Sequence, residues 1–325
     1  MQWEPGASLE TLQQCGLLRT AIREWMLSQS VLEVCTPPLS VAANTEVSIE
    51  PIRTRQTSHE TLRYLHTSPE FAMKRILAAY PETDIYQIAT VFRAEEQGRY
   101  HASQFSLLEW YRVGMNHLQL LADVESLLRH VYQTMQLEFP GVSCCSYAEV
   151  VNSHLGGWPQ ELEGRQVQDY FRQRGRSFPP SVLQDLNACL DLFIDEFVLP
   201  EFAPSQFTFV LDYPASQAAL ARISENDAGV PVAERFELYY GQLELANGFH
   251  ELTDAQEQRH RLQRDVDRRR ILGKPHLPID ENFLAALEAG LPDCAGVALG
   301  LDRLLMGLTG HPHIANVVCF DDEHA

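Results

Sequence analysis

Two strand-like segments joined by a polar connection most constrain what this chain can fold into. Residues 85–92 are rich in β-branched and aromatic side chains, and residues 104–112 alternate in character. The connection between them is polar and contains a glycine, which predicts an antiparallel hairpin with a long loop. Because side chains alternate along a strand, one face of the second segment carries Phe105, Leu107, Glu109 and Tyr111.

The charged residues at this hairpin indicate a chemistry. A Glu such as Glu109 between apolar neighbours is costly to bury without a partner, so this face is expected to line a polar cavity. Arg93 and Glu95 follow the first strand, and Arg303 begins a late helix. Together with Phe105 across the hairpin, such groups can hold ATP by its α-phosphate, base edge and ring faces. The pattern predicts an adenylate-forming enzyme.

Helical spacing of apolar residues from position 9 to 26 predicts a long amphipathic opening helix, with Ser8 as its N-cap. Pro37 and Pro38 stop further helix and make the connection extended. The helix is expected to pack on the core or to form a dimer interface, and periodicity does not choose between the two.

A second helix is expected after Ser68 and Pro69, which suit an N-cap and a first turn. Glu70 falls in the first turn, where the helix dipole favours an acid in any protein. By itself this pattern indicates ordinary capping.

Glu237, Glu244 and Glu251 recur every seven residues, which would be one stripe on a helix. The surrounding glycines and aromatic-rich runs favour strands over residues 235–252 instead. Carboxylates that converge from neighbouring strands suit Mg²⁺ and an ammonium group.

The remaining segments carry weaker signals. Thr253 and Asp254 precede a polar helix rich in arginine, with a solvated face as the ordinary interpretation and docking of an acidic partner as the alternative. Residues 297–299 are strand-like and lead into the helix of Arg303. Gly296 and Gly300 flank this strand as though backbone or ligand must approach closely. The basic side chains of the polar helix and its end are Arg259, Arg261, Arg264, Arg268, Arg269, Arg270 and Lys274.

Composition excludes several classes of protein. With 325 residues, 45% of them apolar, the chain can bury a large core. A formal net charge of −19 repels polyanions, which argues against DNA and disfavours tRNA as partners. Seven cysteines without a C-x-x-C pair fit reduced thiols. The first residues lack a signal-peptide pattern, and no run reaches the roughly 18 apolar residues of a membrane span. We expect a cytoplasmic protein without a membrane partner.

Together these segments resemble class II aminoacyl-tRNA synthetases, and closely the lysyl branch, over almost the whole chain. The resemblance implies an α+β fold, a six-stranded antiparallel sheet flanked by helices. It implies one catalytic domain over residues 1–325 with a mainly helical insertion at about 115–200, and a homodimer formed through the opening helix and the strand after Pro37. The motifs that carry it are Thr67-Ser68-Pro69-Glu70, Phe92-Arg93-Ala94-Glu95, Arg99-Tyr100-His101, Phe105 with Glu109-Trp110-Tyr111, residues 244–252, and Gly300-Leu301-Asp302-Arg303.

The resemblance also implies how ATP is held. Arg93 and Arg303 would be the catalytic residues, with Arg93 on the α-phosphate and Arg303 opposite Phe105 on the adenine ring. Glu95 would take the adenine amino group and His101 the distal phosphates. The full ATP-binding set is Arg93, Glu95, His101, Phe105, Glu244, Leu245, Gly300 and Arg303.

The implied amino-acid site consists of Ser68, Pro69, Glu70, Tyr111 and Glu251. Glu70 would take the amino group next to the carboxyl, while Tyr111 and Glu251 would bind the side-chain ammonium. Glu237 and Glu244 would position Mg²⁺. The chemistry agrees, because an ionised carboxylate that attacks the α-phosphorus needs no general base, only alignment and charge neutralisation.

Two features separate the chain from lysyl-tRNA synthetases. No anticodon-binding barrel is expected, because the opening helix begins almost at once. The sequence Pro-Ala-Ser-Gln at residues 214–217 is similar to the elongation factor P lysine ligases. Those enzymes use ATP and Mg²⁺ to adenylate (R)-β-lysine, or less well α-lysine, and pass it to a lysine ε-amine of elongation factor P. The alternatives are a truncated synthetase paralogue that acts on tRNA or another acceptor, and a non-catalytic regulator that binds lysine or nucleotide.

The chain also departs from the ligase pattern. Ala94 stands where the family usually has Asn, and Ala102-Ser103-Gln104 replaces Asn-Pro-Glu. Three polar contacts on the ATP side are thereby lost or neutralised. We expect weaker nucleotide or metal binding, by about 1 kcal/mol for each neutral hydrogen bond lost.

Overall fold

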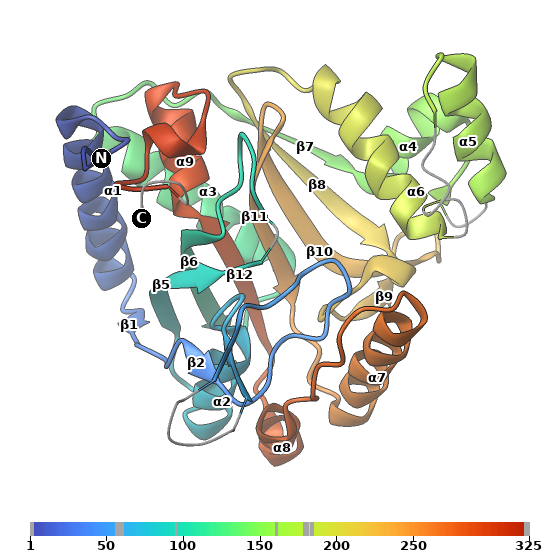
Figure 1. Ribbon diagram of the computed structural model, residues 1–325, viewed down its shortest axis with the longest axis horizontal. Coiled ribbons are helices and arrows are strands. Elements are labelled where there is room, and N and C mark those ends of the chain that lie inside the picture. Colours follow the sequence, from blue (N-terminus) through green and yellow to red (C-terminus); the bar gives the residue numbers. More distant parts are fainter. Residues whose placement is uncertain are drawn as a thin grey trace. The chain divides into compact units, whose positions relative to one another are not determined.

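The computed structural model describes residues 3–55, 62–94, 96–159, 162–177, 182 and 185–321 (Figure 1). The chain divides into two compact units. The first contains residues 1–139 and 250–325, and the second contains residues 140–249. The single domain with a helical insertion at about 115–200 stays a prediction, and the part of this range before residue 140 belongs to the first unit.

The main sheet of the first unit has the strand order β1-β5-β6-β12. Its strands are β1 (Leu32–Glu33), β5 (Ile85–Phe92), β6 (Gln104–Val113) and β12 (Cys294–Gly300). The predicted hairpin is confirmed, since β5 and β6 pair antiparallel from Ile85 opposite Tyr111 to Phe92 opposite Gln104. β12 pairs antiparallel with β6, and β1 pairs parallel with β5. A small second sheet joins β2 (Leu39–Ser40), β4 (Leu62–Leu65) and β3 (Arg53–Arg55).

Four of the six helices described in the first unit begin at a side chain that caps them. The six helices are α1 (Leu9–Ser28), α2 (Glu70–Ala79), α3 (His117–Thr134), α7 (Ala255–Ile271), α8 (Glu281–Gly290) and α9 (Leu301–Thr309), followed by a 3₁₀ turn, η5 (Ile314–Asn316). The capped helices are α1, α3, α7 and α8, whereas α2 and α9 do not begin at a capping side chain. The Ser8 hydroxyl accepts the N–H of Thr11 at 3.1 Å, which confirms the predicted start of α1. The N-cap of α2 is Pro69, one residue later than expected, and the Ser68 hydroxyl accepts the Glu70 N–H at 3.4 Å.

Two groups of helices pack within the first unit. α1 packs against α3 and α9, and α9 also contacts β6 and β12 (Figure 1). α2 packs against α8, where Phe71 and Phe283 stack with ring centroids 4.3 Å apart. Apolar side chains of α2, α7 and α8 form one core with β5, β6 and β12. The amino-acid-site residues predicted on α2 and β6 are therefore held by a packed core.

Within the second unit the strand order is β11-β10-β8-β7, with β9 paired to β10. The strands are β7 (Val142–Ser146), β8 (Phe207–Pro214), β9 (Ile223–Glu225), β10 (Pro231–Tyr240) and β11 (Leu243–His250). The antiparallel β10–β11 pair confirms strands in place of a helix over this region. The helical segments are α4 (Tyr147–Leu155), α5 (Gly164–Gln173), α6 (Leu186–Phe193), η2 (Ile194–Val198), η3 (Leu199–Glu201) and η4 (Ala215–Gln217).

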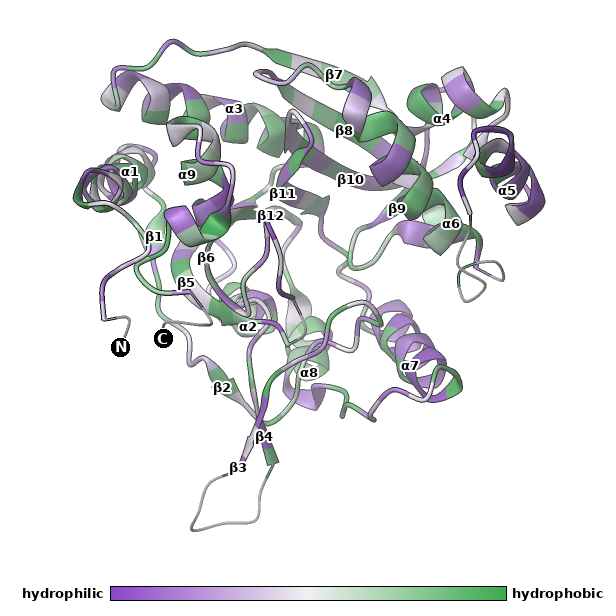
Figure 2. Ribbon diagram, turned by 45° about the horizontal axis from the view of Figure 1, so that its top comes forward, coloured by the Kyte–Doolittle hydropathy of each residue, from purple (hydrophilic) through white to green (hydrophobic). Residues whose placement is uncertain are grey.

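The α+β fold class is confirmed, with differences in detail. Outside the small second sheet, the first unit contributes four of the described strands and the second unit five, so these strands number nine against the six expected. They are not purely antiparallel, because β1–β5 and β7–β8 pair parallel. Figure 2 shows α7 as largely hydrophilic, as predicted. Among the described residues no helix is long and apolar enough to cross a membrane.

Candidate active site

The first turns of α2 place an acid and a base in the interior. Pro69 precedes the helix, so Glu70 is its first residue and Lys74 lies one turn later on the same side. The Lys74 ammonium lies 2.6 Å from a Glu70 oxygen and 2.5 Å from a Glu251 oxygen. The side chains of Lys74 and Glu251 are each 1% exposed. The structure thus brings together Glu70 and Glu251, as the predicted amino-acid site requires, around a lysine that the sequence prediction missed.

Lys74 remains charged although it is buried. Burial by itself lowers the pKa of its ammonium, but the carboxylates of Glu251 and Glu70 more than offset this effect and raise the pKa well above its usual value. The four-residue interval between Glu70 and Lys74 was the available sequence signal, since helical residues at that spacing are neighbours.

Glu109 and Tyr111 of β6 complete this cluster. They lie on the same strand face, and the Tyr111 hydroxyl donates to one Glu109 oxygen at 2.7 Å. Both are about 2% exposed. The other Glu109 oxygen has no hydrogen-bond partner among the described residues. Burial, and secondarily the charge of Glu70, raises the pKa of Glu109 to about 8. The carboxyl group is therefore protonated at neutral pH in the absence of a cationic ligand.

Gly296 makes room for the cluster. β12 places this residue opposite Tyr111. A side chain at position 296 would collide with the Tyr111 ring and with a Glu251 oxygen. The sequence predicted that backbone or ligand approaches this glycine; the groups that approach it are instead side chains, those of two residues of the predicted amino-acid site.

The charges of the cluster suit a ligand with two ammonium groups. Two carboxylates, Glu70 and Glu251, face one internal ammonium, Lys74. One negative charge is left over, and ionisation of Glu109 supplies a second. Because uncompensated buried charge is expensive, the cluster favours a cationic partner. Ser68 and Pro69 line a pocket of about 110 Å³ together with Phe71, and the residues that line this pocket do not include Glu70, Lys74, Glu109 or Glu251.

The basic residues predicted to bind ATP form a second cluster in the first unit. The Arg93 guanidinium lies over the Phe105 ring, 5.0 Å from its centroid, and its Nε donates to the Thr67 carbonyl at 3.5 Å. Arg303 Nε donates to the Tyr100 carbonyl at 3.1 Å. Arg93 therefore lies over the Phe105 ring, the ring that the resemblance places on adenine.

His101 lies near both arginines. Burial lowers the pKa of its imidazole, and the positive charges of Arg303 and Arg93 lower it further, against an opposing effect of Glu96. A neutral His101 is the form expected at pH 7. Arg93, His101, Phe105 and Arg303 are thus brought together, while Glu95 lies outside the described residues.

The start of α9 ties this cluster to the sheet. Gly300 is the N-cap of α9 and the last residue of β12. Asp302, in the first turn, accepts the backbone N–H of Ser106 on β6 at 2.7 Å. This hydrogen bond holds the first turn of α9 against β6, and it thereby positions the backbone of Arg303, the next residue.

The predicted metal residues lie on the β10–β11 hairpin of the second unit. Glu237 accepts hydrogen bonds from Arg235, from Tyr239 and, at 2.6 Å, from Tyr213. Glu244 is paired opposite Tyr239, and the following Leu245 is buried. A carboxylate offers about four lone pairs, so the three donors on Glu237 leave one for a cation. Oxygen donors of this kind fit Mg²⁺.

Comparison with known proteins shows the family of this chain. Residues 8–324 match the model of the family tRNA synthetases class II (D, K and N). A protein of Enterobacter sp. (strain 638), named elongation factor P–(R)-β-lysine ligase, is 41% identical over 327 residues, which covers 99% of this chain and 98% of the relative. Proteins of the same name from Salmonella paratyphi A and Salmonella gallinarum are 40% identical over the same shares. The chain therefore belongs to the class II tRNA synthetases of the D, K and N group and, within them, to the elongation factor P–(R)-β-lysine ligases.

Proposed function

We propose that this protein uses ATP to activate a lysine-like amino acid, (R)-β-lysine or α-lysine, and transfers it to a lysine ε-amine of elongation factor P. The observation that carries the proposal is the buried cluster of Glu70, Lys74, Glu109 and Glu251. Its excess of negative charge matches a diamine acid, and relatives that align over nearly their full length bear the corresponding name.

The amino acid is recognised through its two ammonium groups. Glu70 binds the one next to the carboxyl, and Glu251 with Tyr111 binds the other. As the second ammonium enters, Glu109 loses its proton, because an adjacent cation favours the carboxylate. Buried charge-assisted hydrogen bonds of this kind reject ligands that lack the amine, since the carboxylates would then remain unpaired.

In the activation step, the substrate carboxylate attacks the α-phosphorus of ATP and pyrophosphate leaves. Arg93 binds the α-phosphate, and His101 binds the distal phosphates. Arg303 and Phe105 hold the adenine ring. Glu95 binds the amino group of the adenine. The backbone at Gly300 borders the nucleotide. Mg²⁺, when bound to Glu237 and Glu244, supplies charge neutralisation on the phosphates. The attacking group is already ionised, so alignment and electrostatics provide the rate enhancement.

In the transfer step, the acceptor ε-amine attacks the acyl carbon and AMP leaves. The amine gives up a proton as the amide forms. The products are an aminoacylated protein, AMP and pyrophosphate, which makes the enzyme an AMP-forming ligase. We place it in the cytoplasm, where ATP and the acceptor are available.

The net charge of −19 supports a protein acceptor over tRNA or DNA, because an acidic surface repels polyanions.

Pyrophosphate exchange distinguishes the proposed enzyme from a non-catalytic regulator that binds lysine or nucleotide. A catalyst returns labelled pyrophosphate into ATP when lysine or β-lysine is present, whereas a binding protein does not.

The intact mass of elongation factor P, co-expressed with this chain or without it, tests the function. We expect an increment of one lysyl or β-lysyl group that requires the chain and disappears with Arg303→Ala. An unchanged mass of elongation factor P, together with active pyrophosphate exchange, would reassign the acceptor. Absence of both activities would overturn the proposal.

A further inference from the structure

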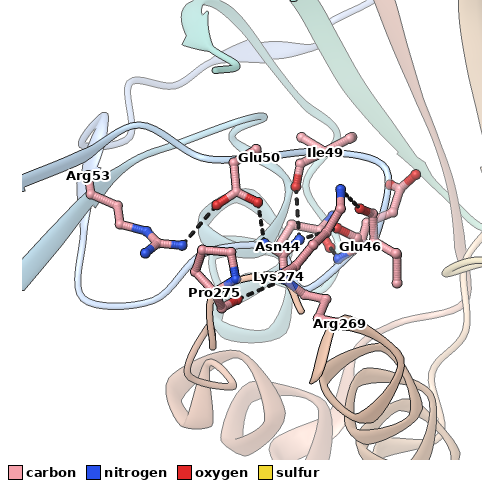
Figure 3. A network of polar contacts seen from close by, with 9 residues as sticks. Asn44, Glu46, Ile49, Glu50, Arg53, Arg269, Lys274 and Pro275 are labelled. Atoms are coloured by element: carbon pink, nitrogen blue, oxygen red, sulfur yellow. Dashed lines mark hydrogen bonds and ion pairs between the residues drawn. The ribbon is translucent and has the colours of Figure 1, made fainter. Parts of the chain in front are cut away.

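A fully buried arginine lies in the last turn of α7, the most polar helix of the first unit. Arg269 is 0% exposed, although the sequence predicted a solvated face for this helix. Its guanidinium donates to the carbonyl oxygens of Glu46 at 3.0 Å, Ile49 at 3.2 Å and Pro275 at 3.2 Å (Figure 3). It also forms an ion pair with the Glu50 carboxylate.

Neighbouring contacts hold the same segment, residues 44–50. Lys274 donates to the Val47 carbonyl at 2.6 Å. The second Glu50 oxygen accepts from Arg53 at 2.8 Å (Figure 3). We call the contacts of Arg269 and Lys274 with residues 46–50 the α7 clamp. The clamp satisfies three backbone carbonyls of the segment with cationic donors, which form stronger bonds than neutral ones.

The segment held by the α7 clamp is paired with the residue that follows Arg93. The Glu50 carbonyl accepts the Ala94 N–H at 2.7 Å, and the two residues form an isolated antiparallel bridge. On the other side, the Arg93 N–H donates to the Ser103 carbonyl at 2.9 Å. Ala94 has no polar side chain to anchor this turn. The bridge to Glu50 is therefore the contact that fixes the backbone just beyond Arg93.

Stability alone does not account for such an arrangement. Replacing buried ion pairs with apolar residues of similar volume is often neutral or stabilising, whereas a multidentate arginine fixes the geometry of the groups it binds. Here the fixed group is a short segment whose isolated backbone bridge leads to Ala94, the residue next to Arg93.

We infer that Arg269 is a positioning residue for amino-acid activation: through Glu50 and the Glu50–Ala94 bridge, it sets the place of the Arg93 guanidinium. The inference rests on the proposed function of Arg93 at the α-phosphate. Arg269 is fully buried and its described contacts are with residues of the chain itself, so it would act through other residues and not on the ligands directly. Its effect falls on the nucleotide step, because none of the described contacts of the α7 clamp involves Glu70, Lys74 or Glu251.

Two variants test the inference in a pyrophosphate-exchange assay. Arg269→Lys keeps the positive charge, but a lysine ammonium cannot bind all four acceptors of the guanidinium, which are three backbone carbonyls and the Glu50 carboxylate. Glu50→Gln keeps the backbone bridge to Ala94 and weakens the contact of this side chain with Arg269. We expect kcat to fall by roughly tenfold to a hundredfold, as for a small displacement of a positioned group. The KM for lysine should stay within about twofold.

Arg270→Gln is the matched control, since Arg270 is the next residue of α7 and its side chain is 80% exposed. It should leave both constants unchanged. Folded Arg269→Lys and Glu50→Gln variants with the kcat of the parent protein would overturn the inference, and so would an equal loss in kcat and lysine affinity. If Arg269→Lys does not fold, Glu50→Gln decides. A parent protein without exchange activity would instead refute the proposed function.

Discussion

Glu109 carries a carboxyl group that is protonated at neutral pH in the free protein, because burial raises its pKa to about 8. In the unfolded chain the pKa of a glutamate is about 4.3. Between these values the folded state binds more protons than the unfolded state. The contribution of Glu109 to stability is therefore fully present below pH ~4.3 and is lost as the pH rises through about 8.

This linkage gives a measurable pH dependence. Without ligand, the free energy of unfolding should fall with rising pH between about 5.5 and 8 relative to that of Glu109→Gln, by up to about 1.4 kcal/mol per pH unit. Thermal unfolding of both proteins across this range would measure the difference. A constant difference between them would contradict a protonated Glu109.

Glu251 is expected to decide recognition of the side-chain ammonium. Glu251→Gln removes one of the two carboxylates around Lys74, so the site loses the charge that attracts the second ammonium. We expect the KM for lysine in pyrophosphate exchange to rise by at least about tenfold, as for loss of one charge-assisted hydrogen bond. The KM for ATP should change little. Normal use of lysine by this variant would show that Glu251 has another role.

At the residue scale, sequence and structure contributed differently to the amino-acid site. Glu109 could be suspected from sequence, because a carboxylate on an apolar strand face needs a polar environment. The four-residue interval could pair Lys74 with Glu70, but the contact of Lys74 with Glu251 could not be predicted, because Glu251 lies far along the chain and reaches Lys74 only through the packed core.

At the scale of elements, β12 depends on its glycine. Gly296→Ala would place a methyl group against Tyr111 and Glu251, both of which are buried. Overpacking of this kind costs about 1–3 kcal/mol. We expect a lower unfolding temperature and a loss of lysine-dependent exchange.

Gly16→Ala in α1 is the control, because this substitution is expected to raise the stability of the protein, whereas Gly296→Ala is expected to lower it. This glycine is inside the helix and a Cβ there would meet nothing within 4 Å. The substitution should stabilise the protein by roughly 0.5–1 kcal/mol and leave exchange unchanged. Equal effects of the two substitutions on exchange would rule out a special demand for space at position 296.

Local signals predicted the elements themselves well. The β5–β6 hairpin, the start of α1 at Ser8 and the strands over 235–252 follow from periodicity, capping and glycine placement, which act over a few residues. The interpretation of α7 was wrong for Arg269. A polar helix looks solvated in sequence, and the acceptors that allow this arginine to be buried come from residues 46–50.

At the scale of the whole molecule, we expect a homodimer. The predicted interface consists of α1 and the strand after Pro37, and both expose large apolar side chains: Leu27 of α1 is 79% exposed, and Val41, directly after β2, is 47% exposed. Exposed apolar groups on neighbouring elements are typical of an interface. Light scattering at micromolar concentration should give twice the mass of the chain, and Leu27→Glu should shift it toward the monomer. A monomeric parent protein would contradict this prediction.

The sequence by itself determined the fold class, the family and the residue types of both clusters, because motifs and periodic patterns are written in short stretches of chain. Only the tertiary structure decided that Lys74 lies between Glu70 and Glu251, that Glu109 is buried deeply enough to hold a proton, and that Arg269 binds residues 46–50. Each of these depends on groups from segments far apart in the chain, and their proximity and desolvation arise only when the core packs.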